Sequence, residues 1–396
     1  MGTSFFDPIY LLTINDNPSV SVHNASRNGY GVIEINCEKY PLNISGLRRA
    51  IAYAFDKEEV ITMHLNGFGI THDSVVPRSN GWCVEDEFSY HYYTARPDIG
   101  NAILDDLNFT IDPGTGYRLA PDGSPFDIEL KYPLGCGGPV SRFMMFDALE
   151  ALHINYTGIY IVNWDEFIET IENHGDYDMF HWTRDFYSNS VEWLVDEFWS
   201  KNAEVYGKNL CNFRNATFDS WIDQLLTGNT YEEVYEAASE MQKILHYNVP
   251  NIIAYENTYM ELYRNDRFTG YVPDLIRHIS GLWTMRKIHH LNGSMGGTVA
   301  VSLAKDPPSF NVLLAESHYS ELILEELYSS LYQAGPNGAP IQDLATSLLM
   351  ETHDDNPEVI SGHTRFTIDL IRNATWTDGM ALTADDVVFT IIYLQQ

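Results

Sequence analysis

The chain has 396 residues, with 55 Asp and Glu against 23 Lys and Arg, so its formal net charge is −32 at pH 7. Hydrophobic residues make up 44% and charged residues 20%, which is typical of a globular protein, and the length favours two or more domains. Such an acidic surface repels phosphate groups, so we expect neither a nucleic-acid partner nor polybasic attachment to a membrane. No apolar run approaches the roughly 18 residues of a membrane-spanning helix. Residues 1–10 lack the basic and apolar regions of a signal peptide.

Other features nevertheless favour an extracellular location. Asn-x-Ser/Thr sequons occur about twice as often as the composition predicts. The glycosylation candidates are Asn24, Asn43, Asn108, Asn155, Asn215, Asn292 and Asn373. The four cysteines, Cys37, Cys83, Cys136 and Cys211, are too widely spaced for a zinc or C-x-x-C motif. Their spacing fits one or two disulfides or four buried thiols, and we expect no metal and no cofactor.

The first strong pattern in chain order is an amphipathic helix over residues 47–65, ended by Gly67. Residues 126–132, 157–162 and 177–182 then read as strands, separated by a helix over 141–154 and by a helix capped by Asn163 with Glu166. This alternation predicts a parallel, doubly wound sheet. Ligands of such sheets lie beyond the carboxyl ends of the strands, where residues 183–185 follow the third strand.

The remaining elements are more scattered. Thr230 and Glu233 form a capping box that opens a helix to about His246. After a small, polar linker at 289–297 we expect a strand over 297–304, a helix over 319–332 and a strand over 364–371. Thr383 with Asp386 caps a last helix, which the chain end at Gln396 leaves truncated.

Four stretches resemble the oligopeptide/dipeptide-binding family (family 5) of extracytoplasmic solute-binding proteins, the receptors of ABC importers. PLNISGLRRAIAYAFDKEEVI (41–61) and the region 218–273 are similar to the carboxy-terminal half of family members. DPPSFNVLLAESHYSELILEELYSSL (306–331) and WTDGMALTADDVVFTI (376–391) are similar to the family's opening segment. The resemblance implies an α/β, two-lobed periplasmic-binding-protein-like fold, with one lobe nearly complete and the opening part of the other.

The family's two ends occur here in reversed order. A carboxy-terminal half (residues 1–288, with the ligand-binding lobe at about 40–250) precedes the linker at 289–297 and an amino-terminal segment (298–396). A tandem array, a circular permutant and a fragment all fit this order. We expect a tandem array, which accounts together for the lack of a signal peptide, the linker and the truncated end. The same break also allows self-association by lobe swapping.

The resemblance also implies the residues that touch a ligand. Trp182-Thr183-Arg184-Asp185 matches the family's W-x-x-D motif, in which the aspartate pairs with the α-amino group of a bound peptide. Trp182 would offer a flat apolar face, and Arg184 a donor for carboxylate or sugar hydroxyl groups. In the opening segment, the residues that match the cleft-lining loop are Glu316, Ser317, His318 and Tyr319.

The expected function is therefore extracytoplasmic binding of peptides or other extended solutes, by lobe closure, for delivery to an ABC permease. An oligosaccharide ligand remains open, because Trp, Tyr and Arg also suit sugars. A glycosylated structural surface or filament protein built on this fold is the alternative. We expect no enzyme: adjacent carboxylates such as Asp105-Asp106 do not face each other on a helix, although a glycoside hydrolase needs only two distant ones.

Overall fold

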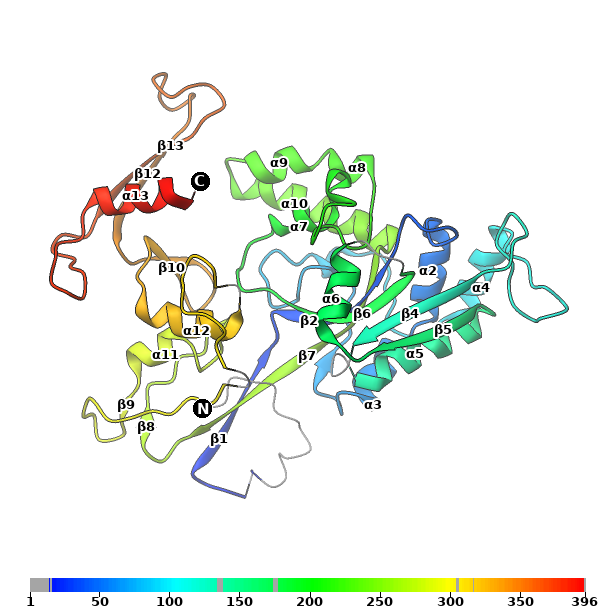
Figure 1. Cartoon of the computed structure of the whole chain (residues 1–396), viewed down its shortest axis with the longest axis horizontal. Helices are drawn as coiled ribbons and strands as arrows, with labels where there is room; N and C mark the ends of the chain where they lie inside the picture. The colour runs from blue at the N-terminus through cyan, green and yellow to red at the C-terminus, as the bar shows by residue number, and fades with distance from the viewer. Residues whose placement is uncertain are drawn as a thin grey trace. The chain divides into compact units, whose positions relative to one another are not determined.

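The computed structural model describes residues 14, 16–133, 138–173, 177–303, 306–315 and 317–394 (Figure 1). The chain divides into two compact units. Among the described residues, the large unit comprises 24–259, and the small unit combines those before 24 with those from 260 onwards. The linker expected at 289–297 thus lies inside the small unit. The end of the carboxy-terminal half (260–288) and the amino-terminal segment from 298 onwards belong to this same unit, and their assignment to separate copies stays a prediction.

The large unit is built on a mixed β-sheet. Its strands are β2 (Gly29–Ile35), β3 (Gly69–Ile70), β4 (Asp127–Pro133), β5 (Asn155–Ile161) and β6 (Met179–Asp185), while β1 (Val20–Ser26) and β7 (Asn251–Arg264) continue into the small unit. The strand order is β1-β7-β2-β6-β4-β5, with β3 paired to β7. Strands β4, β5 and β6 are parallel, as the sequence predicts, whereas β2 is antiparallel to both of its neighbours, β6 and β7.

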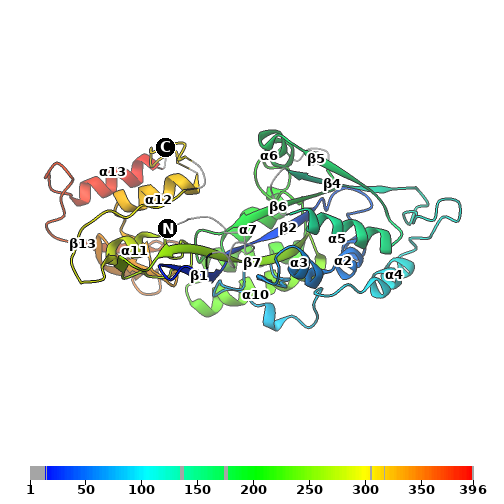
Figure 2. The same ribbon diagram turned by 90° about the horizontal axis from the view of Figure 1, so that it is seen from below.

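The parallel part of the sheet is doubly wound. Helix α5 (Gly138–Ala151) follows β4, and α6 (Trp164–Glu172) follows β5. Met145 and Leu149 of α5 join the core beneath the sheet, while Phe167 and Ile171 of α6 pack in a separate apolar cluster with Phe180. Figure 2 shows the two helices on opposite sides of β4 and β6. The Gly-rich segment 135–138 precedes α5 in the sequence, and its residues 135–137 lie outside the described residues.

Further helices complete both layers of the large unit. They are α2 (Ser45–Ala54), α3 (Lys57–Met63), η2 (Glu85–Glu87), α4 (Pro97–Asp106), α7 (Trp193–Phe198), η3 (Ser200–Asn202), α8 (Ala216–Asp219), α9 (Ile222–Thr227) and α10 (Tyr231–Asn248). The expected helix at 47–65 is two helices, because Asp56 accepts a hydrogen bond from the Glu59 N–H and starts a new one. The capping box of Thr230 and Glu233 is confirmed at α10.

The small unit holds the remaining elements. They are β8 (Phe268–Thr269), α11 (Leu282–Lys287), β9 (His289–His290), α12 (His318–Leu327), β10 (Tyr332–Ala334), β11 (Pro340–Gln342), β12 (Ala345–Glu351), β13 (Arg365–Leu370) and α13 (Ala384–Leu394). The strand expected at 364–371 is confirmed as β13, paired with β12. Asp386 caps α13 by accepting hydrogen bonds from the backbone and hydroxyl of Thr383.

Two expectations for the small unit are wrong. The described residues of 297–304 are irregular apart from a single bridge at Ser302, so alternation there does not produce a strand. A strand also needs a neighbour that takes its backbone hydrogen bonds, which a local pattern cannot supply. The helix expected at 319–332 ends at Leu327, because the backbone of Tyr328 is extended, and residues 332–334 form β10.

Ion pairs and hydrogen bonds join the early and late segments of the small unit. The Arg277 guanidinium bonds Glu325 at 2.6 Å and Glu321 at 3.1 Å, which fixes α12 beside the chain that precedes α11. The indole N–H of Trp283 donates to the carbonyl oxygen of Ala334 at 2.8 Å. Among the described residues, no helix is both long and apolar enough to cross a lipid bilayer.

The sequon asparagines are mostly accessible. Asn24, Asn43, Asn108, Asn155, Asn292 and Asn373 are exposed. Asn215 is half-buried and caps α8, its side-chain oxygen accepting from the N–H groups of Thr217 and Phe218 at 2.9 and 3.0 Å. Glycan attachment at these sites stays a prediction, and the geometry suits the six exposed residues better than Asn215.

Candidate functional site

Asp185 is the last residue of β6, at the carboxyl end where a ligand is expected. Its carboxylate forms a two-pronged ion pair with Arg27, with Nε–Oδ1 at 2.6 Å and Nη2–Oδ2 at 2.7 Å. The Tyr259 hydroxyl donates to Oδ1 at 3.0 Å. The Asp185 side chain is 29% exposed and that of Arg27 only 7% exposed, so the carboxylate is accessible while its partner is buried.

Arg27 is itself held from several sides. Its Nη1 donates to Oδ1 of Asn257 at 3.0 Å, and its guanidinium lies 5.4 Å from the centroid of the Tyr259 ring. Burial opposes the charge of Arg27, but Tyr259 and Asp185 raise its pKa above the usual value. The cation is therefore fixed in place and cannot swing away from Asp185 without losing several bonds.

Close packing of β2 against β6 makes this pair possible. Gly29 lies opposite Asp185 in the ladder. A Cβ atom at residue 29 would lie 2.2 Å from the carbonyl oxygen of Arg184 and 2.9 Å from the Asp185 carboxylate. Only glycine fits this position, and the backbone that follows Arg27 can thus pass directly over the end of β6.

Two further loops meet beside the ion pair. The Asn28 amide donates to the carbonyl oxygen of Phe186 at 2.6 Å, and the Ser79 hydroxyl donates to that of Arg27 at 3.3 Å. The indole N–H of Trp82 donates to the carbonyl oxygen of Asn189 at 3.0 Å. Residues 27–28, 79–82 and 185–189 therefore form one surface, which we call the Asp185 surface.

Aromatic rings border part of this surface. The Trp82 ring lies 5.0 Å from that of Tyr231 and 6.4 Å from that of Tyr235, and the two tyrosines stack on each other at 5.6 Å. Tyr231 is 58% exposed. The exposed ring of Tyr231, supported by the half-buried Trp82 and Tyr235, offers a flat face to apolar side chains or sugar rings.

Arg184, in contrast, lies on the opposite face of the sheet from Asp185, because successive strand side chains alternate. Its Nη1 donates to the Glu197 carboxylate at 2.6 Å, and Nη2 donates to the other oxygen. Burial opposes its charge, yet Glu197 and Glu34 raise the pKa of Arg184 above its usual value. The side chain is 15% exposed and has an internal partner, so it stabilises the packing of α7 on the sheet.

Trp182 shares that opposite face. The Arg184 guanidinium lies 5.2 Å from its ring centroid, and the ring makes an edge contact with Phe180 at 5.7 Å. Its indole N–H points to the Glu34 carboxylate at 3.5 Å. Thr183 lies in the ladder opposite Gly31, on the same face as Asp185. The W-x-x-D stretch is thus divided between two faces, and only Thr183 and Asp185 share one.

Glu34 is buried among these groups. Burial raises its pKa to about 7, against the opposing effect of Arg184. A carboxyl group with such a pKa changes charge near neutral pH, which makes this face of the sheet sensitive to pH.

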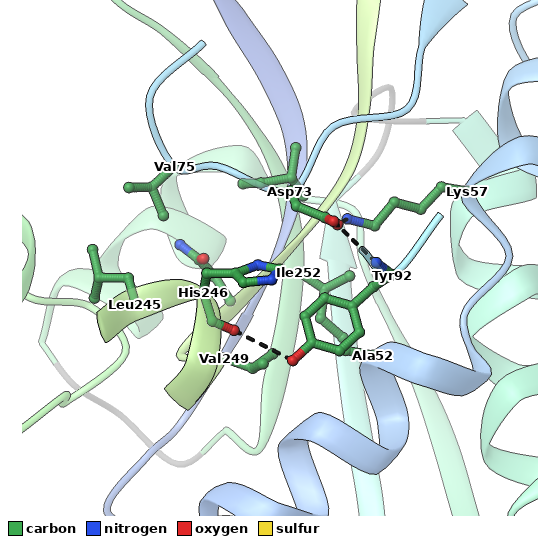
Figure 3. A pocket seen from close by; sticks show the side chains of 11 residues that line it. Ala52, Lys57, Asp73, Val75, Tyr92, Leu245, His246, Val249 and Ile252 are labelled. Carbon is green, nitrogen blue, oxygen red and sulfur yellow. Dashed lines mark hydrogen bonds and ion pairs between the residues drawn. The ribbon is translucent and has the colours of Figure 1, made fainter. Parts of the chain in front are cut away.

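A second charged cluster lies deeper, beneath the loop of residues 71–93 (Figure 3). Lys57 Nζ lies 2.5 Å from the Asp73 carboxylate, which also accepts from the Tyr92 N–H at 2.9 Å and contacts the His91 ring at 3.1 Å. Burial would raise the pKa of Asp73, but Lys57 and His91 hold it well below its usual value. The cavity that Lys57, Asp73 and Tyr92 share with His246 has a volume of about 10 Å³, room for about one water, so it is a structural junction.

Beside it lies a buried histidine–carboxylate pair. His72 Nδ1 is 2.5 Å from Glu85 Oε2, and Cys83 adds a third potential metal ligand within 4.8 Å. Two ligands of a tetrahedral zinc ion, each about 2.0–2.2 Å from it, lie roughly 3.3 Å apart. The pair is closer than that, and Glu85 also accepts from the N–H groups of Asp73 and Ser74. An ion pair therefore explains the arrangement of His72 and Glu85 better than a metal site does. Asp73, Glu85 and His91 form a second group of potential metal ligands among the described residues.

The second set of predicted residues belongs to the small unit. Glu316 lies outside the described residues. Ser317 precedes α12 and makes no side-chain cap, His318 is the first residue of that helix, and Tyr319 is half-buried. These residues and Asp185 therefore belong to different units, and their shared role stays a prediction.

The partners of Asp185 could not be found from the sequence pattern. Arg27 lies in a short turn (Arg27–Asn28) between two strands, and Tyr259 in the middle of the long β7. Trp82 lies in an irregular loop. Only the Gly29-Tyr30-Gly31 spacing hinted at a close approach of two backbones, because glycine in a strand often marks one.

Comparison with known proteins identifies similar chains. A family model described as bacterial extracellular solute-binding proteins, family 5 middle, matches residues 3–204, about half of the chain. A curated dipeptide-binding protein from Escherichia coli strain K12 is 21% identical over 272 residues, which is 68% of this chain and 48% of that protein.

Solved structures resemble the chain as well. The oligopeptide-binding protein AppA from Bacillus subtilis, in complex with a nonapeptide, matches with a TM-score of 0.61 and 16% identity over 72% of this chain and 55% of that one. A periplasmic oligopeptide-binding protein from Thermotoga maritima with bound mannohexaose matches with a TM-score of 0.58 and 19% identity over 73% and 58%. The chain thus spans about half the length of these relatives.

Proposed function

Because the chain belongs to the bacterial extracellular solute-binding proteins of family 5, we propose that its large unit is the lobe that recognises an extended peptide, with Asp185 as the anchor of its amino end. Family membership and the mixed α/β fold of periplasmic peptide-binding proteins, expected from the sequence, are confirmed. The binding, its location outside the cytoplasm and delivery to an ABC permease are part of the proposal.

One observation carries the anchor role: a partly exposed carboxylate at a strand end, oriented by a buried arginine. A carboxylate has about four lone-pair positions, so an amine can bond Asp185 while Arg27 and Tyr259 hold its plane. The ion pair also limits how strongly the charge of Asp185 can attract an amine. Arg27 already neutralises the carboxylate, so the amine gains from a directed hydrogen bond more than from net charge.

In this proposal, the ligand is captured when the two lobes close around it. A ligand stabilises the closed state only by its stronger binding to that state, and the closed form is what a permease would recognise. Binding without catalysis is consistent with the relatives named above, all of which are described as binding proteins. None of them is described as a structural surface or filament protein.

Oligosaccharide binding is the second candidate. The aromatic cluster of Trp82, Tyr231 and Tyr235 favours it, because aromatic faces bind sugar rings. One relative was solved with mannohexaose. The two candidates differ at Asp185, since a neutral sugar has no amino group to pair with it.

Calorimetric titration of the purified chain with trialanine, N-acetyl-trialanine and mannohexaose separates the two. The peptide candidate predicts binding of trialanine and a loss of about 10- to 150-fold in affinity on acetylation or in the variant Asp185→Asn. Asp196→Asn, which removes an exposed pair with Lys208, is the matched control and should bind as the unmodified chain does. Equal affinity of Asp185→Asn for trialanine would contradict the anchor role. Binding of mannohexaose alone would favour the second candidate.

A further inference from the structure

Cys37 and Cys211 meet although they come from distant parts of the large unit. Cys37 follows β2 closely, and Cys211 lies in the turn between η3 and α8. The Cys37 N–H donates to the carbonyl oxygen of Cys211 at 2.8 Å. The flanking residues reinforce this contact, since the Asn212 amide donates to the Asn36 side-chain oxygen at 3.3 Å. The two backbones are therefore held side by side.

Their thiols share one apolar environment. Cys211 is 1% exposed and packs in a cluster with Phe213 and Phe218, and Cys37 is half-buried against the same cluster. The two thiols lie within hydrogen-bonding range, with the Cys211 thiol as donor and the Cys37 sulfur as acceptor. Among the described cysteines, Cys83 makes no such bond: it lies near His72 and Glu85, and burial raises its pKa to about 12.

The two thiols differ in reactivity. Burial opposes a thiolate at Cys37, but the hydrogen bond from Cys211 and the charge of Arg48 lower its pKa below the usual value. Burial and the neighbouring Cys37 raise the pKa of Cys211. Cys37, the more exposed of the two, therefore forms the nucleophilic thiolate first.

We propose that Cys37 and Cys211 form a structural disulfide. This proposal goes beyond ligand binding, and it rests on the family's location outside the cytoplasm. The Cys37 thiolate attacks a disulfide of an extracytoplasmic thiol oxidoreductase, and one sulfur of that oxidant leaves as a thiolate. Cys211 then loses its proton and attacks the Cys37 sulfur of the mixed disulfide. The second sulfur of the oxidant leaves, so the new S–S bond oxidises two thiols while the oxidant is reduced to its dithiol.

Such a bond would fix the far end of β2. This strand begins at Gly29, against Asp185, and ends two residues before Cys37. The disulfide would join that end to the loop that leads from η3 into α8, and so fasten the helical layer of α7 to α10 to the sheet. A link between such distant positions also restricts the unfolded chain.

Peptide mapping of the full chain, exported from cells or treated with oxidised glutathione, tests this directly. The protein is denatured in N-ethylmaleimide without reductant and then digested. We expect the Cys37 and Cys211 peptides as one cross-linked species that disappears on reduction, an intact mass about 2 Da below that of the reduced chain, and Cys83 labelled. Full labelling of both Cys37 and Cys211, or a cross-link of either to Cys136, would overturn the proposal.

Variants add a readout on stability. Cys83→Ser should keep the cross-link, and Cys37→Ser should leave Cys211 open to labelling. Reduction should lower the urea midpoint of Cys83→Ser by roughly 1 M and leave that of Cys37→Ser unchanged. An equal response of the two variants would contradict a stabilising bond, and the map of the unmodified chain decides the linkage even if Cys37→Ser folds poorly.

Discussion

Arg27 holds Asp185 by both carboxylate oxygens, at 2.6 and 2.7 Å, although the two residues lie 158 positions apart. The pair joins the turn before β2 to the end of β6, and it orients the group that we propose as the ligand anchor. Its partners have different exposure, with the cation buried and the anion accessible. The stability of the fold and the proposed ligand binding therefore both depend on this ion pair. Substitutions of Arg27 and of Asp185 should affect the two differently.

Replacing Arg27 should cost stability. Arg27→Gln leaves the Asp185 carboxylate without its main partner, and breaking such a largely buried pair costs about 3 kcal/mol of the free energy of unfolding. Urea unfolding of Arg27→Gln, Asp185→Asn and the double variant measures the coupling. The double variant should lose less than the sum of the single losses, and simple additivity would show that the pair contributes little.

A substitution on the opposite face of the sheet should change the stability of the fold but not the ligand affinity. Glu197→Gln removes the partner of Arg184 beneath α7, and a loss of about 2 kcal/mol is expected in urea unfolding. Because this face points away from Asp185, trialanine affinity in calorimetry should stay within about twofold of the unmodified chain. A large drop in affinity with little loss of stability would instead return Arg184 to the ligand site expected from the sequence.

Stability should fall as the pH rises through the titration of Glu34. Burial raises its pKa from an ordinary 4.5 to about 7, so between these values the folded protein keeps a proton that the unfolded chain has released. Raising the pH across this window therefore lowers the free energy of unfolding, by on the order of 3 kcal/mol. Glu34→Gln should remove this dependence, with a gain over the unmodified chain at pH 8 and little difference at pH 4.5.

Urea unfolding at both pH values checks this expectation. Glu232→Gln, at an exposed position on α10, is the matched control and should follow the unmodified chain. Parallel pH profiles for Glu34→Gln and the unmodified chain would mean that Glu34 keeps its ordinary pKa in the folded protein.

In the small unit, Arg277 should hold α12 in place. Arg277→Gln removes the bonds to Glu321 and Glu325, and we expect amide hydrogen exchange in residues 318–327 to rise by about fivefold. Arg365→Gln, which removes a partly exposed pair with Glu351, should leave exchange in α12 unchanged. Equal protection of α12 in both variants would mean that apolar packing alone secures the helix.

Local patterns predicted the elements that depend on nearby residues. The capping box of Thr230 and Glu233 and the parallel run of β4, β5 and β6 both follow from short-range spacing. The expected strand at 297–304 is wrong for the converse reason, since strand formation depends on a partner elsewhere in the chain. The single helix expected at 47–65 divides at Asp56, whose capping role competes with a continuous helix.

The sequence by itself determined the family, the doubly wound core and the place of Asp185 at a strand end, because each of these depends on motifs or on a period of two or 3.6 residues. Only the tertiary structure decided which side chains meet there. Strand alternation turns Trp182 and Arg184 away from Asp185, and chain folding brings Arg27 and Tyr259 to it. Contacts between residues far apart in sequence depend on strand order and register, and no local pattern encodes these.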